Sequence, residues 1–420
     1  MVAKSFLGVV PTLLFLSSSA FTQPKGLSES AASSTWVLGA NTDSVTMCVA
    51  YELPYRKIIF TKSNDSPSRF SAQLSFSVDA LDSVRGINHR CSARKDVTAR
   101  SFDETRSDSR RAADFVTVTL PRSVYNINME LRDDPQKISY LNTVVRKHFL
   151  PRDSSEVLSV IFLDSLSGEN YYPAISNDVA PFPHRIRLLV LSKAKTTLSA
   201  SLSNKSLERP EVTCEVPLTF AGDRLQPLRG VDGFFMSDSK DSSGAFYLGV
   251  IPIDTLTEGN FELKLSQAGR TTVYPFKYLW LDKPSSLRDA TMALSLLKYI
   301  IPDSLYAEIT SGSDKEIEEK FDSFWKAHDP TPGTAFNELE AEYYERADYA
   351  FEQFRSIGTR NGAATDRGKA YILFGKPESV KREYRSDGTY EIWNYPNLKR
   401  SLVFREKGAG DFMLYQTEKL

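Results

Sequence analysis

Short segments in which apolar and polar residues alternate fill the chain from residue 35 to residue 280 and restrict this part to a mostly β fold. In FSAQLSFSV (residues 70–78), Phe70, Leu74 and Phe76 fall on one face of a strand. Many short strands separated by turn residues are typical of β-sandwiches, so we expect two antiparallel β-sandwich domains, over residues 35–150 and 151–281. The expected strands are residues 45–51, 56–60, 70–78, 115–120, 125–131, 157–163, 185–191, 197–203, 212–220, 245–253, 261–266 and 273–280.

Two segments with a shared pattern support this division. LPRSVYNINMELRD (residues 120–133) and LTEGNFELKLSQAG (residues 256–269) each contain a turn, an aromatic residue and an alternating stretch. We expect each to form a late strand that closes its own sheet. The pattern also allows a helix over residues 137–148. Residues 85–111 are rich in arginine but contain Phe102 as the one aromatic residue, so we expect a solvated hairpin loop rather than a nucleic-acid site.

The hydrophobic period changes from that of strands to that of helices at Lys283. Three helices are expected: one over residues 285–302, one that starts at the capping box of Ser313 and Glu316, and one after Thr334. Strands are expected after them at residues 369–374, 390–395, 401–406 and 411–416. We therefore expect residues 282–420 to form an α+β domain with three helices and a small antiparallel sheet.

The N-terminus has the features of a signal peptide. One charge, Lys4, precedes the apolar segment FLGVVPTLLFL (residues 6–16), and the small residues SSSA follow at 17–20. We expect cleavage after residue 20, a linker over residues 21–34, and export to the periplasm or the extracellular space, with attachment to the outer membrane left open. No later segment is apolar enough to span a bilayer, so no transmembrane segment is expected in the mature chain.

Charge balance and the spacing of cysteines and histidines argue against nucleic-acid binding and against a metal site. The chain has 52 Lys and Arg residues against 53 Asp and Glu residues, so no overall field attracts nucleic acid. Its three cysteines, Cys48, Cys91 and Cys214, form no CxxC pair, and its four histidines are scattered. We therefore expect no metal, no cofactor and no nucleic-acid partner. A disulfide between Cys48 and Cys91 is open, and three buried free thiols are the favoured alternative.

Few side chains are placed to perform chemistry. Asp366 and Arg367 stand just before the strand expected at 369–374, which favours an ion pair or side-chain-to-backbone bonds that hold a loop. The alternative is an exposed acid at a cleft. Glu338 and Glu342 share one helix face, so a hydrolase site formed with Asp366 and Arg367 is the competing functional hypothesis.

The C-terminal third resembles a known family. FWKAHDPTPGTAFNELEAEYYERADYAFEQF, GAATDRGKAYILFGKPE and YEIWNY occur in the order typical of the GWxTD domain, over residues 281–420. The name motif is Gly-Trp-x-Thr-Asp, and Ala363 stands here where the family has tryptophan. The matching positions are Asp329, Pro330, Asn337, Glu338, Tyr343, Tyr344, Arg346, Gly362, Thr365, Asp366, Arg367 and Gly368.

The resemblance implies an exported bacterial protein with a β-rich N-terminal part, and it implies no particular reaction. Because no nucleophile, metal set or acid–base pair is visible, we favour a non-enzymatic envelope protein that binds a protein or a glycan. The envelope hydrolase built on Asp366, Arg367, Glu338 and Glu342 remains the alternative.

The signal peptide gives a direct test. Mass spectrometry of the protein purified from its native envelope should find an N-terminus near Phe21, because the small residues before it suit signal peptidase. A cytoplasmic protein that keeps Met1 would contradict export.

Overall fold

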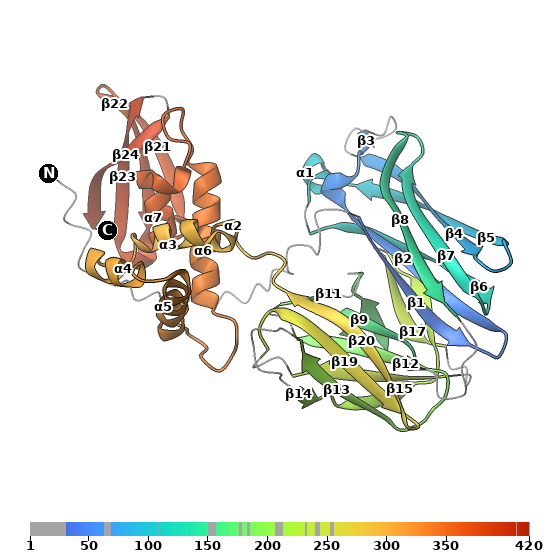
Figure 1. The fold of residues 1–420 in the computed structure, drawn as a ribbon. Coiled ribbons are helices and arrows are strands. Elements are labelled where there is room, and N and C mark those ends of the chain that lie inside the picture. The colour runs from blue at the N-terminus through green and yellow to red at the C-terminus, as the bar shows by residue number, and fades with distance from the viewer. Residues whose placement is uncertain are drawn as a thin grey trace. The chain divides into compact units, whose positions relative to one another are not determined.

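The computed structural model describes residues 31–419 apart from 63–68, 108, 150–156, 176–178, 183–184, 206–212, 232, 240–243, 253–255 and 409. The described residues form two compact units, one within residues 31–282 and one that starts at Lys283 (Figure 1). The expected signal peptide lies outside them. The structure confirms a mostly β chain in which sheets fill the N-terminal part, and helices and a small sheet form the C-terminal part.

Two sheets form the first half of the N-terminal unit. The β2 sheet has the order β1-β2-β6, and the β4 sheet has the order β3-β4-β7-β8 with β5 paired to β4. The strands are β1 (Ala32–Ala40), β2 (Ser44–Pro54), β3 (Thr61–Lys62), β4 (Phe70–Asp82), β5 (Asn88–Ala99), β6 (Arg111–Pro121), β7 (Val124–Asp133) and β8 (Ile138–His148), with a short helix α1 (Phe102–Thr105) after β5.

Two further sheets form the second half. The β12 sheet has the order β15-β18-β12-β9-β10-β17-β16, and the β19 sheet has the order β11-β20-β19-β13-β14. Their strands are β9 (Val157–Ser167), β10 (Asn170–Pro173), β11 (Val179–Pro181), β12 (Ile186–Ser192), β13 (Leu198–Asn204), β14 (Thr213–Glu215), β15 (Leu218–Gly222), β16 (Leu225–Arg229), β17 (Phe234–Asp238), β18 (Ala245–Ile251), β19 (Gly259–Gln267) and β20 (Arg270–Leu279).

The β2 sheet is buried on both faces. Val49 and Tyr51 pack with Phe76 and other side chains of the β4 sheet, whereas Cys48 and Phe115 pack with side chains of the β12 sheet. This two-sided burial explains why VTMCVAY in β2 is a continuous apolar run rather than an alternating one. The β12 and β19 sheets also touch, because the rings of Phe162 and Phe276 lie 5.1 Å apart. The division of this unit into two sandwich domains at residue 150 stays a prediction.

Several predictions for single segments of this unit are wrong. Residues 138–148 form strand β8 rather than a helix, because Lys137, at φ 56°, ends a tight turn that pairs them with β7. Residues 88–99 form the edge strand β5 rather than a loop, and its outward side chains are polar and exposed. Both β7 and β19 have a partner strand on each side, so neither closes its sheet.

Smaller differences concern element boundaries. Strand β1 starts at Ala32, inside the linker expected to end at residue 34. Residues 55–57 form a 3₁₀ turn that overlaps the start of the strand expected at 56–60, and the strand expected at 212–220 is divided into β14 and β15. Strand ends are decided by pairing with distant segments, which local sequence does not reveal.

The C-terminal unit has more helices than expected. Asp289 interrupts the helix expected over residues 285–302, because its side chain accepts from the Met292 N–H at 3.0 Å and starts a new helix. The capping box of Ser313 and Glu316 is confirmed. The helices are α2 (Ser285–Arg288), α3 (Ala290–Leu297), α4 (Asp303–Ile309), α5 (Asp314–Ala327), α6 (Glu338–Gln353) and α7 (Asp366–Phe374), and the strands are β21 (Ser379–Arg385), β22 (Gly388–Tyr395), β23 (Arg400–Gly408) and β24 (Asp411–Lys419).

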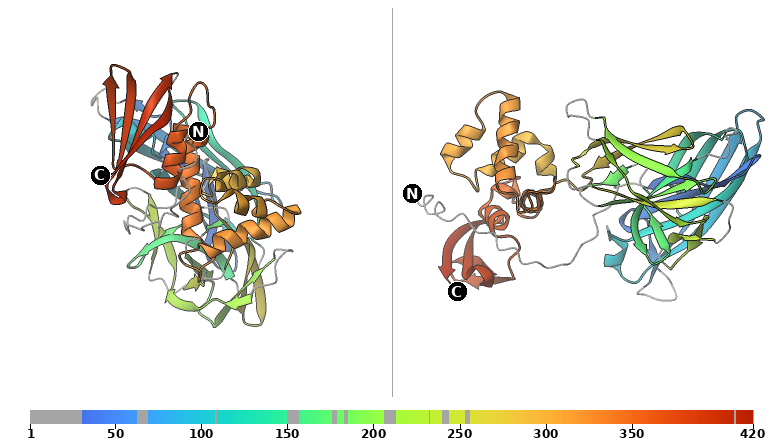
Figure 2. Two further views of the ribbon diagram at one scale, coloured as in Figure 1. Left: turned by 90° about the vertical axis from the view of Figure 1, so that its left-hand side faces the viewer. Right: turned by 90° about the horizontal axis from the view of Figure 1, so that it is seen from below.

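Residues 369–374, expected as a strand, belong to α7. Thr365 caps this helix, and Gly375, at φ 73°, ends it in a conformation that favours glycine. Ile372 packs into the core of the helices, and Ala370 packs into the core of the sheet. Helix α7 therefore lies between the helices and the β21-β22-β23-β24 sheet (Figure 2).

Since the C-terminal unit has its own cores, a fragment from Lys283 to Leu420 should fold alone. We expect one cooperative thermal transition and a near-UV circular dichroism signal from its buried tyrosine and tryptophan rings. A fragment without either signal would show that the unit depends on the β-rich part.

Candidate functional site

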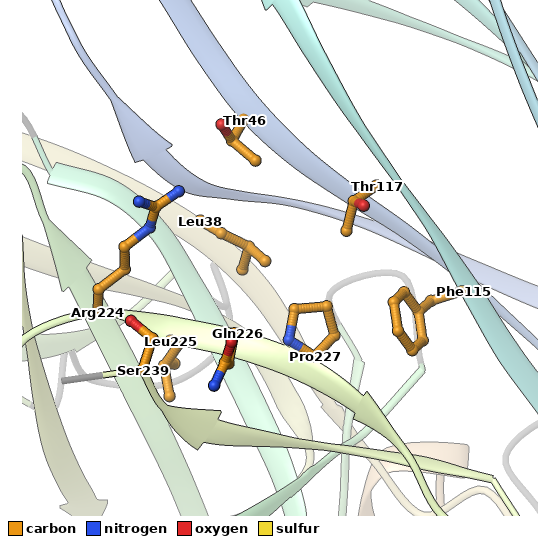
Figure 3. Close-up of a pocket in the computed structure, with 9 residues that line it drawn as sticks. All are labelled: Leu38, Thr46, Phe115, Thr117, Arg224, Leu225, Gln226, Pro227 and Ser239. Carbon is orange, nitrogen blue, oxygen red and sulfur yellow. The ribbon is translucent and has the colours of Figure 1, made fainter. Parts of the chain in front are cut away.

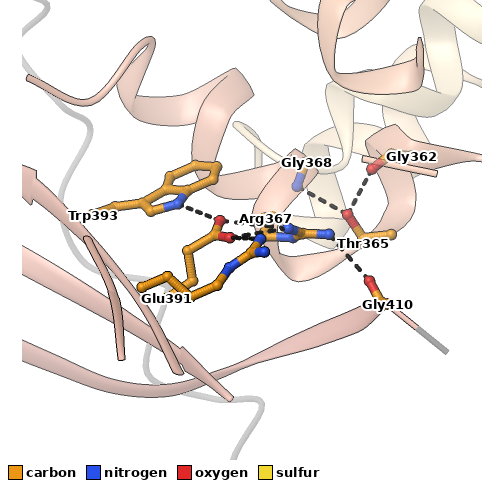
Figure 4. Close-up of polar contacts among 8 residues, drawn as sticks. Gly362, Thr365, Arg367, Gly368, Glu391, Trp393 and Gly410 are labelled. Atoms are coloured by element: carbon orange, nitrogen blue, oxygen red, sulfur yellow. Dashed lines mark hydrogen bonds and ion pairs between the residues drawn. The ribbon is translucent and has the colours of Figure 1, made fainter. Parts of the chain in front are cut away.

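The family-motif residues Gly362, Thr365 and Gly368 form the N-terminal cap of α7 (Figure 4). The Thr365 hydroxyl donates to the Gly362 carbonyl at 2.7 Å and accepts from the Gly368 N–H at 3.0 Å. A Cβ at Gly368 would overlap the Gly362 carbonyl, and a Cβ at Gly362 would overlap the Ala350 carbonyl. Both glycines are therefore required by close backbone contact, and the cap is a structural device.

Arg367 extends from α7 to the sheet. Its Nη1 lies 3.4 Å from Glu391 Oε1 of β22, its Nη2 donates to the Gly410 carbonyl at 3.2 Å, and its guanidinium lies 4.3 Å from the centre of the Phe412 ring. Glu391 also accepts from Arg382 Nη2 at 2.9 Å and from Trp393 Nε1 at 2.8 Å. The side chains of Arg367 and Glu391 are 12% and 7% exposed, so this is a buried ion pair.

The polar surroundings of Glu391 control its charge. Burial by itself would raise the pKa of the carboxyl, but hydrogen bonds from Arg382 and Trp393 and the charge of Arg367 lower the pKa overall. Asp366 has a different partner from Arg367, because its Oδ2 accepts from the Leu414 N–H of β24 at 2.9 Å. The two residues thus fix α7 on the sheet, whereas the sequence placed them in a loop before a strand.

The remaining motif residues also make local structural contacts. Asp329 accepts from the Thr331 N–H at 2.8 Å in a turn that includes Pro330, and Glu338 accepts from the Thr331 hydroxyl. Asn337 caps α6 through the N–H groups of Leu339 and Glu340, both at 3.0 Å. The hydroxyls of Tyr343 and Tyr344 donate to the carbonyls of Leu296 and Ala293, and Arg346 pairs with Glu342.

Ala363 occupies the tryptophan position of the name motif. It is fully buried in the core of the helices, in the same cluster as Trp325 and Tyr344. The position that carries tryptophan in the family is therefore a core position in this chain. Because alanine is smaller than tryptophan, neighbouring side chains of this core must occupy the volume that a tryptophan ring would take.

The hydrolase hypothesis gains no support from these positions. Glu338 accepts from Thr331, Glu342 pairs with Arg346, Asp366 accepts from Leu414 and Arg367 pairs with Glu391, so these four side chains bind four different partners. Within the same part of the chain, no group of three or more His, Cys, Asp or Glu side chains could hold a metal ion.

The cysteines are free thiols in this structure. Cys48 lies between the β2 and β12 sheets, whereas Cys91 packs on the other side of the β2 sheet, so a disulfide between them does not form. Burial raises the pKa of the Cys48 thiol, and the nearby Asp114 raises it further. This thiol is therefore protonated and unreactive.

A cavity of about 410 Å³ lies between the β2 and β12 sheets, and we take it as the candidate functional site (Figure 3). Polar groups occur on both walls. The Oγ of Ser239 is buried without a hydrogen-bond partner in the described part of the chain. The lining residues are Leu38, Thr46, Phe115 and Thr117 from the β2 sheet, and Arg224, Leu225, Gln226, Pro227 and Ser239 from β16 and its neighbouring segments.

Sheet geometry explains how this cavity forms. Thr46 and Thr117 lie on the same face of the β2 sheet as Cys48 and Phe115, and this face continues from the apolar core into the lining of the cavity. A register shift in β1 between Val37 and Gly39 accompanies this opening. The guanidinium of Arg224 lies against Gly39, 3.4 Å from where a Cβ would stand, and so borders the opening.

Arg229 contacts Phe115 and the neighbouring Asp114. Its guanidinium lies 4.6 Å from the centre of the Phe115 ring, its Nε donates to Asp114 at 2.8 Å, and its Nη2 donates to the Phe115 carbonyl at 2.9 Å. These contacts fix Phe115 in one orientation. The sequence did not reveal the site, because its residues come from three distant segments that share no motif.

Comparisons with known proteins agree with the C-terminal architecture. The family model described as GWxTD domain matches residues 272–409, so the chain contains this domain. A comparison with curated proteins gives no match. In the described residues, no helix is long and apolar enough to cross a membrane.

The buried ion pair of Arg367 and Glu391 should make a large contribution to stability. Glu391→Gln should lower the unfolding free energy by about 3–5 kcal/mol, because it leaves the buried Arg367 without its carboxylate partner. Arg367→Met should cost less, about 1–3 kcal/mol, because Glu391 keeps its hydrogen bonds from Arg382 and Trp393. The double variant should cost less than the sum of the two single changes. Denaturant unfolding of the C-terminal fragment measures all three.

Arg355→Met is the matched control, since Arg355 pairs with Glu352 on an exposed surface and should cost under about 1 kcal/mol. The pH dependence gives a second readout. Because the pKa of Glu391 is lowered in the folded state, its contribution is present above the unfolded pKa of about 4.3 and is lost as the pH falls through the folded pKa. Equal losses for Arg367→Met and Arg355→Met would contradict this assignment.

Proposed function

Because the chain contains a GWxTD domain, we propose that it is an exported, non-enzymatic binding protein of the bacterial cell envelope, in the periplasm or outside the cell. In this proposal the N-terminal part consists of two β-sandwiches, formed by the β2 and β4 sheets and by the β12 and β19 sheets. The ligand is a glycan, and it binds in the cavity between the β2 and β12 sheets.

The composition of the cavity carries the proposal. Hydroxyls of Thr46, Thr117 and Ser239 and the amide of Gln226 can exchange hydrogen bonds with sugar hydroxyls. Leu38, Leu225, Pro227 and Phe115 supply apolar lining of the kind that packs against the C–H face of a sugar. The volume is within the range of small-molecule sites.

Arg224 adds a preference for an acidic sugar. A guanidinium has five N–H donors and forms strong, charge-assisted hydrogen bonds with a carboxylate, so Arg224 can bind one while it keeps its contacts within the protein, and it lines the cavity together with Thr46 (Figure 3). A saccharide that contains a uronic acid would place hydroxyls on the threonines and its carboxylate on Arg224. We therefore take an acidic saccharide as the preferred ligand class.

Binding without catalysis fits the residues at this site. Among the nine lining residues there is no Asp, Glu, His, Cys or Lys, so a general acid–base pair is not present in the lining. Ser239 has no neighbouring base within this set to activate it. The GWxTD domain then has a structural or scaffolding role, since its motif residues hold the helices on the sheet.

Binding can be measured with defined sugars. Isothermal titration calorimetry with oligosaccharides that contain a uronic acid should detect binding, and the neutral analogues should bind about tenfold more weakly. Arg224→Met should remove this difference, because the guanidinium supplies it. Thr117→Trp should abolish binding of both sugars by filling the cavity.

Thr98→Trp is the matched control, since Thr98 lies exposed on β5, away from the cavity. It should bind like the unchanged protein. Unaltered binding by Thr117→Trp, or an absence of binding to every saccharide in the panel, would refute the proposed site.

A further inference from the structure

The turn between β4 and β5 exposes three large apolar side chains. Val84 is 75% exposed, Ile87 is 50% exposed and Leu81 is 43% exposed. They are neighbours in the chain, at the end of the hairpin where Leu81 pairs with Asn88 (Figure 1). Single exposed apolar residues are ordinary on a protein surface, but three gathered on one turn indicate a contact surface.

This turn is held in a fixed conformation. Asp82 is 1% exposed, and its Oδ1 accepts from the N–H groups of Val84 and Arg85 at 2.8 and 3.0 Å. The same oxygen accepts from the Ser123 hydroxyl at 2.8 Å. Gly86, at φ 69°, donates its N–H to the Asp82 carbonyl. The apolar side chains are therefore presented outward by a rigid scaffold and cannot fold back into the core.

Arginines surround the apolar turn. Arg85 lies in it, and its side chain is 53% exposed. Arg90 of β5 is exposed, and Arg146 of β8 is exposed one strand beyond Asn126, which pairs with Leu81. The nearby acids are less exposed than these arginines. The carboxylate of Asp82 is buried and lies 4.0 Å from Arg85 Nε. Asp79 is partly covered, accepts a hydrogen bond from Asn88 and lies 3.6 Å from Arg90 Nε.

We propose that this turn docks on an anionic lipid bilayer. Val84, Ile87 and Leu81 enter the boundary between headgroups and acyl chains, and Arg85, Arg90 and Arg146 bind headgroup phosphates. A projecting apolar turn ringed by cations complements a surface that is anionic outside and apolar beneath. A protein partner that covered so narrow a tip would need a pocket to receive it. The inference is independent of the glycan cavity.

A vesicle assay tests the proposal. The chain from residue 21 onward should sediment with vesicles of phosphatidylglycerol and phosphatidylcholine in equal parts, and should stay in solution with phosphatidylcholine alone. Omitting the apolar segment at residues 6–16 prevents it from binding lipid by itself. The double variant Val84→Ser, Ile87→Ser should bind the anionic vesicles about tenfold more weakly.

Val231→Ser is the matched control, because Val231 is 98% exposed in a different loop, and it should bind unchanged. The double variant Arg85→Gln, Arg146→Gln should lose the dependence on anionic lipid and on salt. Thermal transitions equal to that of the unchanged chain verify folding.

Three outcomes overturn the proposal. The first is no sedimentation with anionic vesicles. The second is equal binding by the serine double variant and by Val231→Ser. The third is a dimer in analytical ultracentrifugation that the serine double variant abolishes, since this would show that a second copy covers the turn.

Discussion

Burial of the β2 sheet on both faces is the constraint on which the N-terminal unit depends. A sheet with only one covered face can present polar side chains on the other, but β2 has apolar residues on both. Two further sheets are needed to cover it, one on each side. The cavity is a consequence of this arrangement, because the second face changes from Cys48 and Phe115 to the threonines at 46 and 117 before the sheet ends.

In the C-terminal unit, the short helix α7 must be held in one position on the sheet. Nine residues of α7 bury few apolar side chains, so packing alone would define its register poorly. The Arg367–Glu391 pair and the bond from Leu414 to Asp366 supply directional contacts that work in one register only. Removing charges from water is costly, and hydrogen bonds from Trp393 and Arg382 offset part of that cost.

Sequence reasoning predicted the class of both parts because period and capping are local properties. The alternation in β4 and the capping box at Ser313 were confirmed. Residues 369–374 form a helix where the sequence predicts a strand, because a short apolar run fits either period and the Thr365 cap lies in a segment whose composition predicts a loop. The sequence pattern also allows a helix at residues 138–148. These residues form a strand because β8 pairs with β7, and local sequence does not reveal that pairing.

Local sequence patterns do not predict the candidate cavity, for a different reason. Its walls come from β1, β2, β6 and the β16–β17 region, which are brought together by the packing of two sheets. Each side chain there is ordinary in its own segment, so no spacing along the chain marks it. The family-motif residues differ from these lining residues in two ways. Their spacing along the chain is distinctive, and their contacts hold helices and turns in place. In this chain the signature residues therefore support the geometry of the fold through the contacts that they make.

Glu340 shows why a perturbed carboxyl does not by itself indicate catalysis. Its pKa is raised to about 7, mainly by burial and also by the charge of Asp322, and Lys283 offsets part of this rise. Such a value would suit a general acid or base. However, Glu340 stands in the first turn of α6, where its N–H binds the Asn337 cap, and the cavity lies in the other compact unit. An acid with a suitable pKa performs chemistry only where a substrate can reach it, and the candidate cavity between the β2 and β12 sheets belongs to the other unit of the chain.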